Sequence, residues 1–259
     1  SEQSWIDELR GEMERAVREQ MVSDVPIGAF LSGGIDSSAV VAFMSRHTDR
    51  PVRTYSIGFA GSSGAALYNE LPHACTVAQA FGTAHREILV QPAVAALLPQ
   101  LLWHMDEPVA DAAFITTYLV SKFAREDVTV ILSGVGGDEL FGGYRRYLDE
   151  HYRRLYQRIP GLIRSGVLAP LAGLLPSDRH SRVLNQMRLA KAFLQADSLP
   201  FEERYRAYMQ VFDAVEREGL MKGGVPAGFD DCIARGFAAA QTADPLRQLM
   251  DVDFATQLP

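Results

Sequence analysis

Cysteine is scarce in this sequence, which has only Cys75 and Cys232 among its 259 residues. The two lack the short spacing of metal ligands, and a disulfide framework in a chain of this size would be sparse. We therefore expect a reduced, cytoplasmic protein. No apolar run is long enough to cross a membrane, and the polar, charged stretch 1–20 differs from a signal peptide. These absences predict a protein with neither a membrane span nor a leader.

An excess of positive charge is missing as well, because 25 Lys and Arg residues stand against 32 Asp and Glu residues and the formal net charge is −7. Nucleic-acid binding depends on a basic surface, so we expect no nucleic-acid partner. The acidic total does not exclude ATP, since backbone amides and one metal ion can build a phosphate site locally.

Short apolar runs alternate with helical patterns through the first half of the chain. The patterns predict strands at 26–31, 52–59, 87–90 and 128–132, and helices at 4–22, 37–46, 71–81, 93–105 and 112–126. The stretch 60–66 is rich in Gly, Ser and Ala and is expected to be a loop. Strands that alternate with helices imply βαβ units, a parallel sheet and an α/β fold.

The pattern changes near residue 148, after which the sequence contains no convincing strand. Helices are predicted at 181–196, 200–220 and 230–240, separated by Pro and Gly. We therefore divide the chain into an α/β core at 1–148 and a helical lobe at 149–259.

A glycine-rich loop, Ser32-Gly33-Gly34-Ile35-Asp36-Ser37-Ser38, follows the first predicted strand. Its glycines allow the backbone to approach an anion closely, and the next helix would direct its free amides and dipole at the same point. The loop has no lysine, so it is not a Walker A motif. A carboxylate beside phosphates is understandable if Mg²⁺ lies between them. The alternative is a plain turn in which Asp36 caps the helix.

A second glycine-rich segment follows the strand at 128–132 and reads Ser133-Gly134-Val135-Gly136-Gly137-Asp138. Open α/β sheets bind ligands beyond the carboxyl ends of their strands. Asp138 is therefore a candidate partner of Asp36 on the metal ion. A flexible loop with a capping acid is the alternative, but it explains so many glycines poorly.

Together the two segments resemble the signatures of the glutamine-hydrolysing asparagine synthetase family, within the ATP pyrophosphatase (PP-loop) superfamily. The resemblance covers residues 20–147 in the expected order. It includes Val25-Pro26-Ile27-Gly28, Tyr55-Ser56-Ile57-Gly58-Phe59, Asn69-Glu70-Leu71-Pro72, Phe81-Gly82-Thr83 with His85, and Asp106-Glu107-Pro108 with Asp111. It implies a PP-loop, adenine-nucleotide α-hydrolase-like fold with a parallel sheet, helices on both faces and a C-terminal helical lobe.

The resemblance also implies an activity, that of an ATP-dependent carbon–nitrogen ligase that forms AMP. Such an enzyme adenylates the side-chain carboxylate of aspartate, releases pyrophosphate, and uses ammonia from glutamine to form asparagine. Asp36 and Asp138 would then hold Mg²⁺ and serve catalysis. The implied ATP-binding residues are Leu31, Ser32, Gly33, Gly34, Ile35, Asp36, Ser37, Ser38, Ile57, Ser133 and Gly134.

Three departures from the family pattern qualify this reading. Position 135 is usually acidic in the family, where the carboxylate is thought to assist the intermediate, but here it is Val135. The chain begins with Ser1 in place of the family's catalytic cysteine, and it lacks a later segment with Lys and Arg. We therefore expect a piece of a longer protein, without the N-terminal glutaminase domain and with a truncated lobe.

The same residues are compatible with other functions. Val135 modestly favours an amidotransferase acting on a different carboxylate, and a non-catalytic nucleotide-binding module is a further alternative. Homodimers are common in the family, so the resemblance also implies a possible homodimer. Arg145 and Arg146 either meet a phosphate or substrate carboxylate, or form a solvated helix face.

Overall fold

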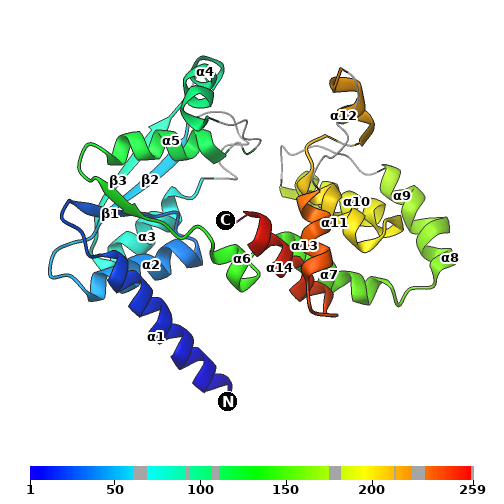
Figure 1. Cartoon of the computed structure of the whole chain (residues 1–259), viewed down its shortest axis with the longest axis horizontal. Coiled ribbons are helices and arrows are strands. Elements are labelled where there is room, and N and C mark those ends of the chain that lie inside the picture. The colour runs from blue at the N-terminus through cyan, green and yellow to red at the C-terminus, as the bar shows by residue number, and fades with distance from the viewer. Residues whose placement is uncertain are drawn as a thin grey trace. The chain divides into compact units, whose positions relative to one another are not determined.

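The computed structural model of the chain describes residues 1–60, 69–91, 94–106, 111, 113–174, 182–212, 214–222 and 231–257 (Figure 1). Glu107 and Pro108, and most of the loop expected at 60–66, lie outside these residues. The chain forms two compact units, Ser1–Val135 and Gly136–Pro259. The functional division at residue 148 stays a prediction.

The first unit is built on a sheet of four strands in the order β3-β2-β1-β4. The strands are β1 (Ile27–Phe30), β2 (Arg53–Phe59), β3 (Ala84–Val90) and β4 (Val130–Leu132). All three pairings are parallel, which confirms the predicted α/β fold. β3 begins earlier than predicted because its first residues, including His85 and Arg86, are polar yet pair with β2. An edge strand tolerates such residues, so an apolar run alone underestimates its length.

Helices cover both faces of the sheet, as predicted (Figure 1). One face packs against α1 (Glu2–Gln20), α2 (Ile35–Arg46) and α3 (Leu71–Phe81). The other packs against α5 (Ala113–Ala124), which follows α4 (Val94–Met105). Alternate side chains of β1 separate accordingly, because Ala29 enters the first core and Phe30 the second.

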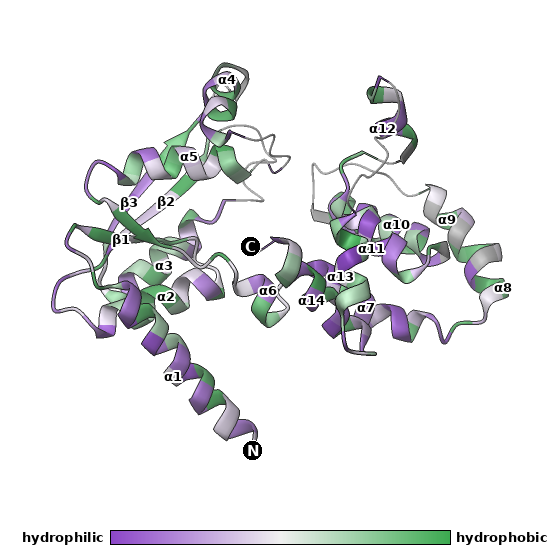
Figure 2. Cartoon of the chain, viewed as in Figure 1, coloured by the Kyte–Doolittle hydropathy of each residue, from purple (hydrophilic) through white to green (hydrophobic). Residues whose placement is uncertain are grey.

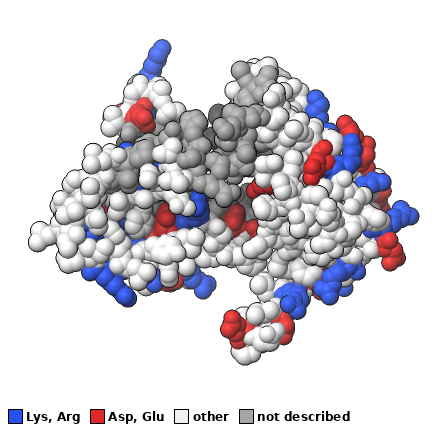
Figure 3. Space-filling model, turned by 180° about the vertical axis from the view of Figure 1, so that it is seen from behind, with Lys and Arg blue, Asp and Glu red and all other residues white. Residues whose placement is uncertain are grey.

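Helix α1 is amphipathic, and its hydrophilic and hydrophobic residues are drawn in Figure 2. Val17 is buried against the sheet, whereas Trp5 and Leu9 are exposed. On the polar side Arg15 pairs with Glu12 and Glu19. Basic and acidic side chains are interspersed over the face of the molecule that Figure 3 draws.

The second unit is helical, and its described residues contain no strand, which confirms the predicted lobe. Its core is formed by Tyr147, Tyr205, Phe237, Leu249 and Val252. No helix among the described residues of the chain is long and apolar enough to cross a bilayer. The elements are α6 (Gly137–Phe141), α7 (Arg145–Tyr156), α8 (Gly161–Ile163), η2 (Arg164–Leu168), α9 (Ala169–Leu174), α10 (Arg182–Gln195), η3 (Ala196–Ser198), α11 (Phe201–Met209), α12 (Ala214–Leu220), α13 (Cys232–Ala239) and α14 (Pro245–Gln257).

Candidate functional site

The topology of the sheet singles out the ends of β1 and β4. Helices α2 and α3 follow β1 and β2 on one face, and the chain then returns to β4 through α5 on the other face. β4 pairs directly with β1, so the direction of winding reverses between these two strands. Such a switch point is where open α/β sheets bind ligands. The two glycine-rich segments begin here.

The first loop needs a glycine at position 33 for steric reasons. Gly33 has a φ of +81°, and a Cβ atom there would lie 2.5 Å from the backbone nitrogen of Ala74 in α3. Gly34 is the N-cap of α2 and provides no side-chain cap for it. The amides of the first turn are therefore available to an anion, and the helix dipole favours one.

The serines of the loop divide into two kinds. The hydroxyls of Ser32 and Ser37 lie 2.9 Å apart, and the Gly34 amide donates to the Ser32 hydroxyl at 3.2 Å. These two side chains therefore hold the loop itself. The Ser38 hydroxyl is buried and has no hydrogen-bond partner within the described residues. A buried hydroxyl without a partner is unfavourable. The Ser45 hydroxyl near the other end of α2 is in the same state within the described residues, so what distinguishes Ser38 is its place beside the uncapped first turn.

The second segment contacts the first through its backbone. A Cβ atom at Gly134 would lie 2.6 Å from the amide nitrogen of Ser37 and 3.0 Å from the Cβ atom of Asp36. The Ser133 hydroxyl accepts a hydrogen bond from the Val135 amide at 3.2 Å. The Val135 side chain is 87% exposed and makes no contribution to the core. The structure thus brings together residues 32–38 and 133–134.

Leu31 and Ile57, the residues expected to contact adenosine, differ in accessibility. Leu31 is 2% exposed and packs in the core, and its amide donates to the Tyr55 carbonyl at 3.0 Å. Its carbonyl accepts from the Ser56 hydroxyl. Ile57 is half-buried on the opposite face of the sheet. Any contact of Leu31 with ATP would therefore involve its main chain, and both assignments stay predictions.

The donor groups near α2 are compatible with a magnesium ion bound together with phosphates. Asp36 lies in the first turn of α2, half-exposed, and its carboxylate has no recorded hydrogen bond or ion pair in the described part of the chain. Among the residues that the structure describes, no group of three or more His, Cys, Asp or Glu side chains gathers there. Mg²⁺ is commonly held by only one or two carboxylates, with phosphate oxygens and water completing its octahedron. The residues present therefore fit the ion.

Asp138 lies in the second unit, on the short helix α6, which glycines bound at both ends. Gly136 precedes it with a φ of +95°, and Gly142 follows it with a φ of +71°. A Cβ atom at Gly143 would overlap the Asp138 carboxylate. The missing side chain of Gly143 thus leaves the space that this carboxylate occupies.

Arg146 belongs to an internal network, which neither sequence-based reading anticipated. Its guanidinium lies 3.7 Å from the centre of the Tyr144 ring, and 2.8 Å separates its Nη2 from the carboxylate of Asp253. Tyr144 in turn donates to the buried Glu139. Burial, and then Glu139, raise the pKa of the Tyr144 phenol. Arg145, by contrast, is exposed.

Comparison with known proteins supports one family. The sequence model of the asparagine synthase family matches residues 8–259. A Mycobacterium tuberculosis protein, named provisionally as a glutamine-hydrolysing asparagine synthetase, is 32% identical over 260 residues, which cover all of this chain and 38% of that protein. Asparagine synthetase [glutamine-hydrolyzing] 1 of Bacillus subtilis is 31% identical over 257 residues, covering 98% of this chain and 38% of the relative.

The chain thus spans 38% of the length of each of these two relatives. Among solved structures, the NH3-dependent NAD synthetase of Campylobacter jejuni matches with a TM-score of 0.39 and 17% identity, over 75% of this chain and 97% of that one. A structural similarity this low supports no inference of its own.

Proposed function

The chain belongs to the asparagine synthase family, and we propose that it is the part of an asparagine synthetase that activates aspartate with ATP. The observation that carries the proposal is the uncapped first turn of α2. Beside it lies the buried hydroxyl of Ser38, which has no hydrogen-bond partner among the described residues. This turn lies at the switch point of the sheet, where it would receive the pyrophosphate part of ATP.

The proposed reaction has two steps. An oxygen of the aspartate side-chain carboxylate attacks the α-phosphorus of ATP, the bond to the β-phosphate oxygen breaks, and pyrophosphate leaves. Ammonia then attacks the activated carbonyl carbon, AMP leaves, and one proton is lost as asparagine forms. In the proposed whole protein, a glutaminase domain supplies the ammonia.

The chain's own residues contribute positioning and charge stabilisation. The first-turn amides of α2 and the Ser38 hydroxyl would bind the leaving pyrophosphate. Asp36 would hold Mg²⁺, with Asp138 as the second carboxylate on the strength of the family resemblance. The ion, when bound, neutralises the charge that develops on the phosphate oxygens.

Val135 provides no carboxylate to accept the proton of the attacking ammonia. Because its side chain is 87% exposed, Val135→Glu should be tolerated without loss of stability. We expect this variant to accelerate the ammonia-dependent step and to leave the activation of aspartate unchanged. The matched variant Val135→Gln, which has the same shape without the charge, should show no acceleration.

The test is ATP–pyrophosphate exchange by the whole protein that contains this chain, with Mg²⁺ and L-aspartate present. We expect aspartate-dependent exchange that Asp36→Asn abolishes. Ser45→Ala, at the other end of α2, is the control and should exchange normally. Exchange with a different carboxylic acid and not with L-aspartate would replace the proposed substrate. ATP binding by the whole protein without any exchange would contradict a synthetase.

A further inference from the structure

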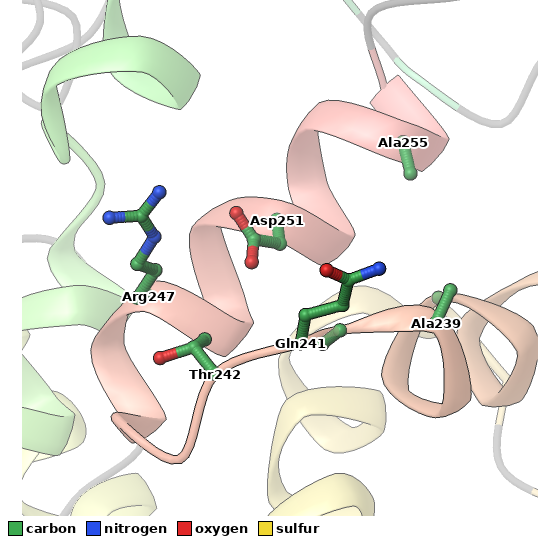
Figure 4. Close-up of a pocket in the computed structure, with 8 residues that line it drawn as sticks. Ala239, Gln241, Thr242, Arg247, Asp251 and Ala255 are labelled. Atoms are coloured by element: carbon green, nitrogen blue, oxygen red, sulfur yellow. The ribbon is translucent and has the colours of Figure 1, made fainter.

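A cavity of about 430 Å³ lies in the helical unit, between α13 and α14 (Figure 4). None of its lining residues belongs to the loops at 32–38 and 133–138. Its size lies within the range of small-molecule sites in proteins, about 300 to 1,000 Å³. The lining consists of Gly236, Ala239, Ala240, Gln241, Thr242, Arg247, Asp251 and Ala255.

Small residues on facing helices create this space. Gly236 of α13 lies against α14, where an added Cβ atom would come within 3.2 Å of Val252. The two helices therefore approach closely at this point. The short side chains of Ala239 and Ala255 leave the cavity open beside this contact. The polar side chains of the lining surround the cavity (Figure 4).

Three of the four polar side chains that line the cavity differ from their neighbours in hydrogen bonding. Within 231–257, where every residue is described, the side chains of Gln241, Arg247 and Asp251 have no recorded hydrogen bond or ion pair. All three line the cavity. The other charged, amide and hydroxyl residues of this segment do have partners: Asp231, Arg235, Thr242, Asp244, Gln248, Asp253, Thr256 and Gln257.

Arg247 and Asp251 carry opposite charges one turn apart on α14, yet they do not form an ion pair in the structure. An acid placed four residues before a base is the better order for such a pair, and here the order is reversed. The residues are separated by about 6 Å along the helix axis. A ligand with a single charge would be attracted by one residue and repelled by the other. A ligand with both charges, close together, matches both.

We propose that this cavity binds a free α-amino acid as its zwitterion. Arg247 receives the α-carboxylate, which suits the planar guanidinium, and Asp251 receives the α-ammonium group. The Gln241 amide and the Thr242 hydroxyl face the same cavity (Figure 4) and favour a side chain that forms hydrogen bonds, such as a carboxamide. The proposal does not rest on the proposed function of the nucleotide loop.

Titration of the purified chain with L-asparagine, without ATP and followed by amide NMR shifts, tests this site. We expect saturable shifts in α13 and α14. Arg247→Gln and Asp251→Asn should each weaken binding about tenfold or more, as expected for a lost charge-assisted hydrogen bond. Both residues are exposed, so the variants should fold. Arg158→Gln, an exposed arginine of the same unit outside the cavity, is the matched control and should bind normally.

Modified ligands test the assignment of each charge without altering the protein. N-acetyl-L-asparagine lacks the ammonium charge, so it should bind more weakly than L-asparagine. Asp251→Asn should not weaken its binding further. L-asparaginamide lacks the carboxylate, so its binding should be insensitive to Arg247→Gln. Asp36→Asn should leave L-asparagine binding unchanged, which separates this site from the nucleotide loop. Absence of saturable binding, or binding that neither cavity variant weakens, would overturn the proposal.

Discussion

Gly134 lies so close to Ser37 that a Cβ atom on the glycine would fall 2.6 Å from the Ser37 amide nitrogen. The two residues follow different strands, β4 and β1, which are neighbours in the sheet. Their contact joins two glycine-rich segments, distant in the sequence, into one surface at the first turn of α2. Only a residue without a side chain permits this approach.

Replacing Gly134 by alanine should therefore weaken ATP binding and destabilise the first unit. The added methyl group has to displace the backbone of α2, and overpacking of this kind costs about 1 to 3 kcal/mol. Calorimetric titration with ATP and thermal unfolding measure the two effects. Gly11→Ala is the control: Gly11 lies in α1 with open space around it, so alanine should raise stability by up to about 1 kcal/mol and leave ATP binding unchanged.

Ser38→Ala should affect stability and binding differently. Its hydroxyl is buried without a partner among the described residues, so its removal should leave the stability of the free protein unchanged or slightly higher. Pyrophosphate binding should weaken, because the hydroxyl is proposed to donate to it. Ser45 of α2 is also buried and unpartnered there, and Ser45→Ala should have the same stability effect without the binding effect. Equal pyrophosphate affinities in the two variants would exclude Ser38 from the site.

The sequence predicted the sheet, the helices of the first unit and both glycine-rich segments because these depend on local patterns. Apolar runs mark buried strands, and clustered glycines mark backbone that must turn sharply or pack closely. The roles of the individual serines could not be predicted from the sequence. Ser32, Ser37 and Ser38 are chemically alike, and only the three-dimensional loop distinguishes the hydroxyls that bond to each other from the one left unpartnered.

The network around Asp253 could not be predicted, because its members are far apart in the sequence. Arg146 and Tyr147 lie more than a hundred residues before Asp253, and Tyr205 approaches it from another helix. The helix α14 that carries Asp253 was also not predicted. Side chains that form hydrogen bonds with each other across a helical core leave no periodic pattern in the sequence.

The pH dependence of stability should show a loss in alkaline solution to which Tyr55 contributes. Burial, and then the neighbouring Asp127, raise the pKa of the Tyr55 phenol to about 12, whereas an unfolded tyrosine ionises near about 10. The folded state therefore holds a proton that the unfolded state releases. The resulting stability is complete below about pH 10 and is lost as the pH rises through about 12.

Tyr55→Phe removes this titrating group. Chemical denaturation at a series of alkaline pH values should show a shallower loss of unfolding free energy for the variant, by at most one bound proton. Phenolate absorbance of the folded protein provides an independent measurement, because the variant should have one tyrosine fewer with a raised pKa. Parallel pH profiles for the two proteins would contradict the assignment.

Loss of the Asp253 carboxylate should destabilise the helical unit more than loss of any surface acid. Asp253 is fully buried and accepts hydrogen bonds from Tyr147 and Tyr205 while it pairs with Arg146. Its removal would leave a largely buried guanidinium and two buried phenols without their acceptor. Breaking one side of a buried ion pair costs about 3 to 5 kcal/mol, so Asp253→Ala should approach that range.

Asp244 provides the matched comparison on the same helical unit. It pairs with Arg154, but more than half of each side chain is exposed, at 51% and 58%, and exposed pairs contribute less than about 1 kcal/mol. Asp244→Ala should therefore have little effect. Chemical denaturation gives the free energies, and hydrogen exchange in α7, α11 and α14 shows where protection is lost. Similar losses for the two variants would mean that the buried network does not stabilise this unit, because burial is the property that separates the two ion pairs.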